Sequence, residues 1–221
     1  MSAAVEALRL AGPDEAADLG GYLTRLLRFD KAAAVRVVAS GGAVGVYGRP
    51  PFDVLTLRTV ALAAGATSGS VASDVDLTVS AGDLLHAIAD DGALTLPRPL
   101  AGATSWAGFL PPRVGWQAVG ELPVAEVETA ALAGIAEFKA RAEAIPDRER
   151  TRAAVDRIAA EIWDRPLTFG LPVRAAHAAR AMAFLGQAQS ASVVVRSAGR
   201  WLRLDAPFGT VVVRTGSGLL A

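Results

Sequence analysis

The sequence contains no cysteine, no asparagine and only two histidines, His86 and His177. The absence of cysteine excludes disulfide bonds, thiolate catalysis and zinc or iron–sulfur sites with cysteine ligands. Two histidines far apart in the sequence also exclude a metal centre that takes several histidines from one chain. The sequence therefore predicts no cofactor and no bound metal ion.

Long apolar runs are absent as well. No uncharged apolar segment reaches the roughly 18 residues that a membrane-spanning helix needs. The first residues, MSAAVEALRLAGPDEAADL, lack the basic start and apolar core of a signal peptide. These features predict a soluble cytoplasmic protein with no membrane partner.

Lysine is scarce, with 2 lysines against 20 arginines, and alanine is abundant. Such residue choices are expected of a GC-rich genome, so neither an arginine nor an alanine-rich stretch is informative by itself. Of the 221 residues 52% are hydrophobic and 20% are charged, which is typical of a well-buried globular protein. The length suits one large domain or two small ones.

The first 97 residues predict a β-rich α+β part. Val35, Val37 and Val38 favour a strand over the alternative helix at 31–40, because β-branched side chains suit a pleated surface. Gly41-Gly42 suits a tight hairpin turn. Ser80 and Asp83 predict a helix cap. The expected elements are a helix at 18–29, strands at 35–39, 43–47, 52–62 and 74–79, a helix at 81–89 and a strand at 93–96.

Residues 98–122 predict a connecting loop rich in proline and tryptophan, with no periodicity. The remaining residues, 123–221, predict a helical segment closed by a β-meander, which either shares one core with 1–97 or forms its own. Its expected helices lie at 123–144, 148–164 and 172–185, and its expected strands at 191–197, 200–205 and 209–215. The fold class is therefore α+β, with a mostly antiparallel sheet, flanking helices, a three-helix segment and a C-terminal β-meander.

Two stretches, RLLRFDKAAAVRVVASGGAVGVYGRPPFDVL and LPVRAAHAARAMAFLG, cover residues 25–55 and 171–186. They resemble a family of actinobacterial proteins of unknown function. The resemblance implies no activity, cofactor or site residue.

Charge is distributed unevenly. Residues 1–164 hold 15 basic and 21 acidic residues, whereas residues 165–221 hold 7 basic residues and only Asp205. A basic helix followed by a basic hairpin has the outline of a winged helix-turn-helix, so one hypothesis is a nucleic-acid-binding module. The alternative, which we favour, is that these arginines pair with acidic residues of the chain or of a second copy. The candidate anion or nucleic-acid contacts are Arg174, His177, Arg180, Arg196, Arg200 and Arg203.

The connecting loop carries Trp106, Phe109 and Trp116, which either line a ligand or partner surface or seal the core. Arg49, just before Pro50-Pro51, is a further candidate for that surface. Asp74 and Asp76 fall on one face of the strand at 74–79, where we favour two solvated carboxylates over an acid–base pair. No residue is assigned a catalytic role.

The leading functional hypothesis is a non-catalytic interaction or regulatory protein that binds a protein partner or a second copy of itself. Nucleic acid is the first alternative partner. The second alternative is a small-molecule enzyme with a site near residues 97–122, so the sequence leaves open whether the protein is an enzyme.

Overall fold

The structure is a computed structural model, and it describes residues 7–64, 75–102, 110–187 and 190–215. The chain divides into two compact units. Unit 1 comprises Met1–Pro51 and Leu55–Pro111, and unit 2 comprises Phe52–Val54 and Pro112–Ala221. The boundary between residues 111 and 112 falls inside the segment 98–122 that was predicted to connect two parts.

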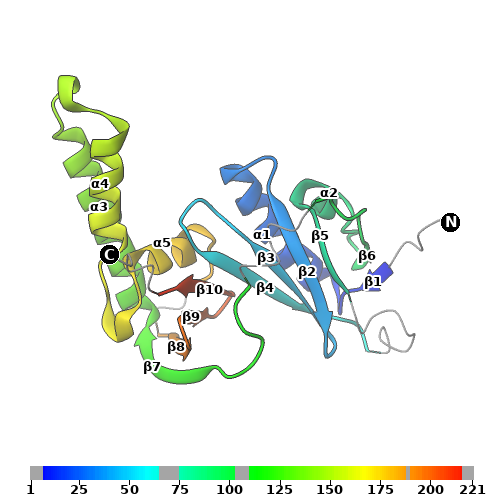
Figure 1. The fold of residues 1–221 in the computed structure, drawn as a ribbon. Coiled ribbons are helices and arrows are strands. Elements are labelled where there is room, and N and C mark those ends of the chain that lie inside the picture. The colour runs from blue at the N-terminus through cyan, green and yellow to red at the C-terminus, as the bar shows by residue number, and fades with distance from the viewer. Residues whose placement is uncertain (1–6, 65–74, 103–109, 188–189, 216–221) are drawn as a thin grey trace. The chain divides into compact units, whose positions relative to one another are not determined.

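The described residues of unit 1 form two helices and two antiparallel sheets. The larger sheet has the strand order β5-β2-β3-β4, and β1 pairs with β6 in a small separate sheet (Figure 1). The elements are β1 Ala7–Arg9, α1 Pro13–Phe29, β2 Ala34–Ser40, β3 Ala43–Gly48, β4 Leu55–Ala61, β5 Asp76–Ser80, α2 Ala81–His86 and β6 Ala93–Thr95.

The hairpin between β2 and β3 forms as predicted. Gly41 and Gly42 have φ values of 59° and 81°, a backbone conformation that residues other than glycine rarely adopt. Ser80 accepts a hydrogen bond from the backbone N–H of Asp83, which confirms the predicted cap of α2. Helix α1 begins at Pro13 rather than at Asp18, because proline fits the first turn of a helix and needs no donor there.

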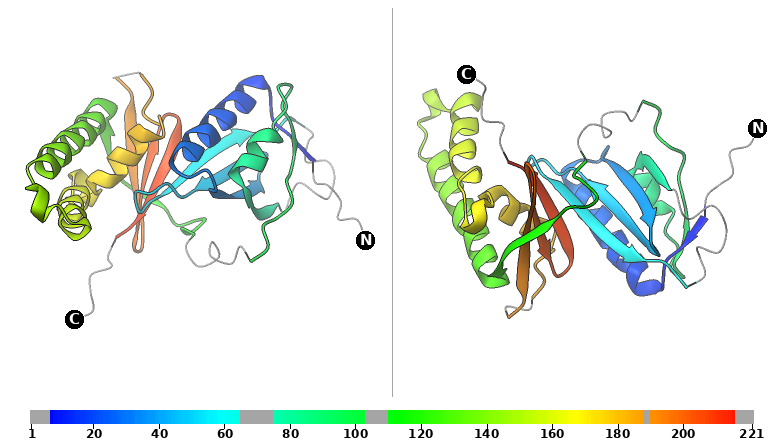
Figure 2. Two further views of the ribbon diagram at one scale, coloured as in Figure 1. Left: turned by 90° about the horizontal axis from the view of Figure 1, so that it is seen from above. Right: turned by 60° about the horizontal axis from the view of Figure 1, so that its bottom comes forward.

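One face of the larger sheet in unit 1 is buried under α1, which lies along the strands (Figure 2). Val35 and Val37 of β2 and Val44 and Val46 of β3 are all 0% exposed. They alternate with more exposed residues, as a strand with one buried face does. The hydrophobic stripe of α1 supplies the other side of this core with Leu19, Tyr22, Leu23 and Leu26.

Unit 2 places three helices before a meander. Its strands follow the order β10-β9-β8-β7, and every pairing in it is antiparallel. The elements are β7 Gln117–Pro123, α3 Val124–Glu143, the 3-10 turn η2 Asp147–Glu149, α4 Arg152–Trp163, the 3-10 turn η3 Thr168–Gly170, α5 Val173–Ala181, β8 Ser192–Ala198, β9 Trp201–Ala206 and β10 Gly209–Arg214. The predicted α+β class is confirmed, as are the three helices and the meander.

Strand β7 is a correction to the sequence analysis, which predicted a loop as far as residue 122. Residues 117–123 pair with β8, and the register shifts between Ala118 and Gly120. The shift is a β-bulge, which breaks the alternation of side chains by which a strand is recognised. Because β7 is also an outer strand with mostly exposed residues, no apolar pattern marks it in the sequence.

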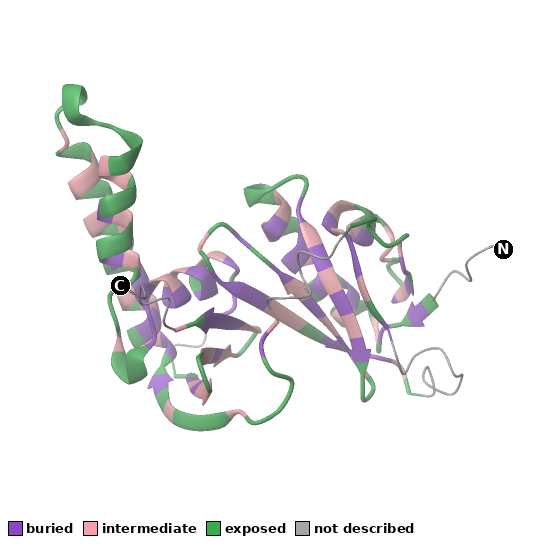
Figure 3. Cartoon of the chain, viewed as in Figure 1, coloured by how far each residue is buried: buried purple, intermediate pink, exposed green. Residues whose placement is uncertain are grey.

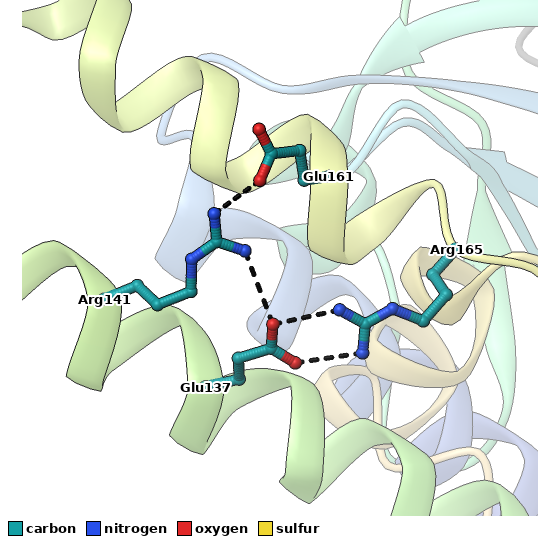
Figure 4. A network of polar contacts seen from close by, with 4 residues as sticks. All are labelled: Glu137, Arg141, Glu161 and Arg165. Atoms are coloured by element: carbon teal, nitrogen blue, oxygen red, sulfur yellow. Dashed lines mark hydrogen bonds and ion pairs between the residues drawn. The ribbon is translucent and has the colours of Figure 1, made fainter.

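Helices α3 and α4 form a hairpin whose far end is exposed (Figure 3). A charged network joins the two helices (Figure 4). Arg165 donates two hydrogen bonds of 2.9 Å to Glu137, and Arg141 contacts both Glu137 and Glu161. Arg165 and then Arg141 lower the pKa of Glu137. Glu137 and Arg141 are four residues apart on α3 and form an i,i+4 ion pair within this network.

Candidate functional site

Helix α5 carries the first group of candidate residues, Arg174, His177 and Arg180. Five of its nine residues are buried, so little of the helix surface is available to contact the bases in a DNA groove. Both arginines have acidic partners within unit 2. Arg174 contacts Asp164 and lies 4.0 Å from Asp53, and Arg180 lies 3.7 Å from Glu128. The positive stripe that the sequence indicates is thus largely neutralised by nearby carboxylates.

His177 lies between two aromatic rings. Its ring centroid is 4.7 Å from that of Phe52, edge to face, and 4.7 Å from that of Trp163. The Nδ1 atom is buried and makes no hydrogen bond with the described residues. Burial, and then the positive charge of Arg180, lower the pKa of His177. The neutral imidazole suits this position, because protonation would bury a second N–H without an acceptor.

We expect the stability of the protein to fall in mildly acidic solution because of His177. The pKa of His177 is lower in the folded state than in the unfolded state. The contribution of the neutral imidazole to the free energy of unfolding is therefore complete above the unfolded pKa of about 6.5, and it is lost as the pH falls toward the folded pKa. Urea unfolding between pH about 7.5 and about 5 measures the loss. H177Q should flatten this dependence relative to the wild type. Parallel curves for wild type and H177Q would contradict this role.

The sheet of unit 2 carries the second group. Arg196 on β8 and Arg203 on β9 both donate through Nε to Asp205, over 2.9 Å and 2.6 Å. Thr210 on β10 donates a third hydrogen bond of 2.9 Å to the same carboxylate. Arg200 lies in the β8–β9 turn, and its carbonyl accepts hydrogen bonds from Thr215. One carboxylate therefore holds two guanidinium groups.

The structure describes only part of the third group, the proposed ligand or partner surface. Trp116 is half-buried, and its Nε1–H donates to the Pro112 carbonyl over 2.8 Å. The guanidinium of Arg203 lies 5.5 Å from the centre of the Trp116 ring. Arg49 is exposed after β3, whereas Trp106 and Phe109 fall outside the described residues.

The predicted candidates therefore separate into a cluster on α5 and a cluster on the sheet. Sequence reasoning missed Phe52 and Trp163, which enclose His177, because their approach depends on tertiary packing. It also missed Trp201 and Arg214. These two lie opposite each other on β9 and β10, and the short turn at Pro207-Phe208, between Ala206 and Gly209, could have indicated that register.

Neither a metal site nor a membrane span is found where the structure describes the chain. Its histidine, aspartate and glutamate side chains form no group of three or more that could hold a metal ion, and none of its helices is long and apolar enough to cross a bilayer. Asp76 is paired with Arg36 through two hydrogen bonds of 2.5 Å and 2.8 Å. Asp74 lies outside the described residues.

Comparison with known families matches each half of the chain separately. Residues 3–108 match a domain of unknown function (DUF8010), and residues 111–218 match another domain of unknown function (DUF8185). Each match covers just under half of the chain, and together the two matches cover most of it. The second match begins at residue 111, next to the boundary between Pro111 and Pro112, whereas Phe52–Val54 of unit 2 fall within the first match. A search of the curated proteins found no match.

Solved structures show a likeness of fold to bacterial DNA polymerase sliding clamps. The DNA polymerase III subunit beta from Pseudomonas aeruginosa matches with a TM-score of 0.50 and 12% identity, covering 98% of this chain and 66% of that one. The sliding clamp from Bartonella birtlesii, bound to griselimycin, matches with a TM-score of 0.51 and 10% identity, and the clamp from Caulobacter crescentus with 0.50 and 12%; each covers 97% of this chain and 66% of the clamp.

This likeness shows the fold alone, because the sequence identities are low. This chain spans just under two thirds of the length of these clamps, since it covers 66% of each. The two domains together therefore correspond to only part of a clamp chain.

Proposed function

We propose that this protein is a non-catalytic interaction protein with a sliding-clamp-like fold that associates with a second copy of itself. One observation carries the proposal: the clamp-like fold extends over 98% of this chain but over only 66% of the clamp. A clamp-like assembly built from this protein therefore needs additional polypeptide, and a second copy of the protein is the simplest source.

The outer strands of the two sheets offer a place for such association. Among the strands that the structure describes, β5 and β7 each have a neighbouring strand on one side only. An outer strand has unpaired backbone groups that can bond to another chain. The free side of β5 is partly covered, because the Leu100 N–H donates to the Thr78 carbonyl over 2.9 Å. We therefore place the contact at β7, where Val119 is 40% exposed.

Sedimentation velocity over a wide range of protein concentration tests the proposal. We expect the wild-type protein to form a dimer or a larger closed assembly as concentration rises. V119K should shift the equilibrium toward the monomer, because it places a charge on an outer strand. V114K is the matched control, since Val114 is 80% exposed and lies outside the strands. A wild-type protein that stays monomeric throughout would overturn the proposal.

A further inference from the structure

One face of the β8–β10 meander is turned away from the helices of unit 2. Val195, Leu204 and Val211 lie side by side across three strands and are each 0% exposed. Helix α5 packs against β10. Successive side chains of a strand point to opposite faces, and residues paired across strands share a face. The residues between these three therefore form the opposite face.

That opposite face is basic and aromatic on β8 and β9, whereas on β10 it carries Val212, which pairs with Arg203 and is 2% exposed. Arg196 pairs directly with Arg203, and Trp201 pairs with Ala198 on one side and Arg214 on the other. The side chains of Arg196 and Arg203 are 36% and 30% exposed, and Arg214 is exposed. The same face also carries the acidic side chains of Asp205 and Glu121, one row away toward the other end of the strands, with Val194 of β8 between them.

Two arginines opposite each other on neighbouring strands repel, which destabilises a sheet. Asp205 offsets part of this repulsion, but it accepts only the Nε–H group of each arginine. Among the described residues, no acceptor bonds to the terminal Nη atoms of Arg196 or Arg203. An arginine carries four N–H donors on these atoms, in a planar fork that matches a phosphate group. Asp205 thus positions both guanidinium groups while leaving their terminal N–H groups available to a ligand.

The aromatic side chains lie beside these arginines. Trp116 is fixed by its hydrogen bond to Pro112 and has the Arg203 guanidinium over its ring. Trp201 is half-buried. It lies on β9 between Arg203 and the β8–β9 turn, and this turn carries Arg200. Side chains that combine phosphate-binding forks with aromatic rings suit a nucleic acid whose bases are unpaired, because only unpaired bases can stack on a protein ring.

We propose that this face, defined by Arg196, Arg203, Arg214, Trp116 and Trp201, binds single-stranded nucleic acid. The guanidinium forks hold backbone phosphates, and a base stacks on Trp201. The sheet therefore takes the role that the sequence analysis gave jointly to helix and hairpin, because the arginines of α5 are paired with carboxylates. This inference does not depend on self-association.

Fluorescence anisotropy with a labelled oligothymidylate, alone and as its duplex with oligoadenylate, tests the proposal. We expect binding of the single strand that weakens steeply with salt, with weaker binding of the duplex. R203Q/R214Q should weaken single-strand binding about tenfold or more and reduce the salt slope by about 0.7 for each lost phosphate contact. R157Q, an exposed arginine of α4, is the matched control and should bind as wild type does.

The ring of Trp201 gives a second test that does not rely on charge. W201A should weaken binding about tenfold, whereas W201F keeps a stacking ring and should lose less. Circular dichroism of each variant checks that it folds, and W201F keeps the test valid if W201A does not. Absence of single-strand binding at low salt, equal affinity for the duplex, or wild-type affinity of R203Q/R214Q would each overturn the proposal.

Discussion

Replacing Gly48 by alanine is expected to destabilise unit 1 by about 1–3 kcal/mol, the usual cost of overpacking a core. A Cβ atom at this position would overlap the hydroxyl of Tyr22 and come within 2.9 Å of Leu26. Both side chains belong to α1 and are 1% exposed, so neither can move into solvent. Gly48 is therefore required by the close approach of α1 to β3 and not by its backbone conformation.

The hydroxyl of Tyr22 allows this explanation to be tested with a double mutant. The Tyr22 hydroxyl forms a hydrogen bond of 2.9 Å with the Thr56 hydroxyl, and burial raises the pKa of the Tyr22 phenol. Y22F alone should cost about 1 kcal/mol for the lost hydrogen bond. In G48A/Y22F the new methyl group no longer meets the hydroxyl, so the double mutant should be less destabilised than the sum of the two single mutants.

Urea unfolding of the four proteins measures this coupling, and G20A provides the control. Gly20 lies inside α1, where a Cβ atom would be 3.7 Å from Leu85, an ordinary contact. Alanine is a better helix former than glycine, so G20A should match or exceed the wild-type stability. Additive losses in G48A and Y22F would show that the methyl group and the hydroxyl do not compete.

Local patterns account for most of unit 1. The paired glycines, the alternating valines of β2 and the Ser80 cap each depend on neighbours in sequence, and each forms as predicted. The start of the third strand does not. Phe52 was predicted to begin it, but Asp53 has a φ of 53°, and β4 begins only at Leu55. Phe52 instead packs against His177, more than a hundred residues away, and no local signal indicates such a contact.

The candidate site shows the same limit. The excess of basic residues after residue 164 is visible in the sequence, but the partner of each arginine is not. Arg174 and Arg180 meet carboxylates from other elements, which only the tertiary fold brings near. Arg196 and Arg203 share Asp205 because of the register of β8 and β9, which a two-residue turn determines. The sequence thus shows where the basic residues are concentrated, and the register of the strands decides which arginines keep N–H groups that are not hydrogen-bonded to a carboxylate.

Replacing Ala178 by leucine is expected to destabilise unit 2 by about 1–3 kcal/mol, for a reason that composition conceals. Alanine is common throughout this chain, so an alanine-rich helix was not by itself informative. In α5, however, four alanines are 0% exposed, namely Ala175, Ala176, Ala178 and Ala179. The helix packs against both α3 and β10, and small side chains let it approach both.

Leucine at position 178 would have to displace α3 or the sheet, because a close-packed interior has no space for three more carbon atoms. A153L is the matched control: Ala153 is exposed on α4, and leucine is nearly as good a helix former as alanine, so its effect should stay within about 0.5 kcal/mol. Urea midpoints for both variants make the comparison. If A178L unfolds at the wild-type midpoint, α5 has room to spare, and codon bias rather than close packing explains its alanines.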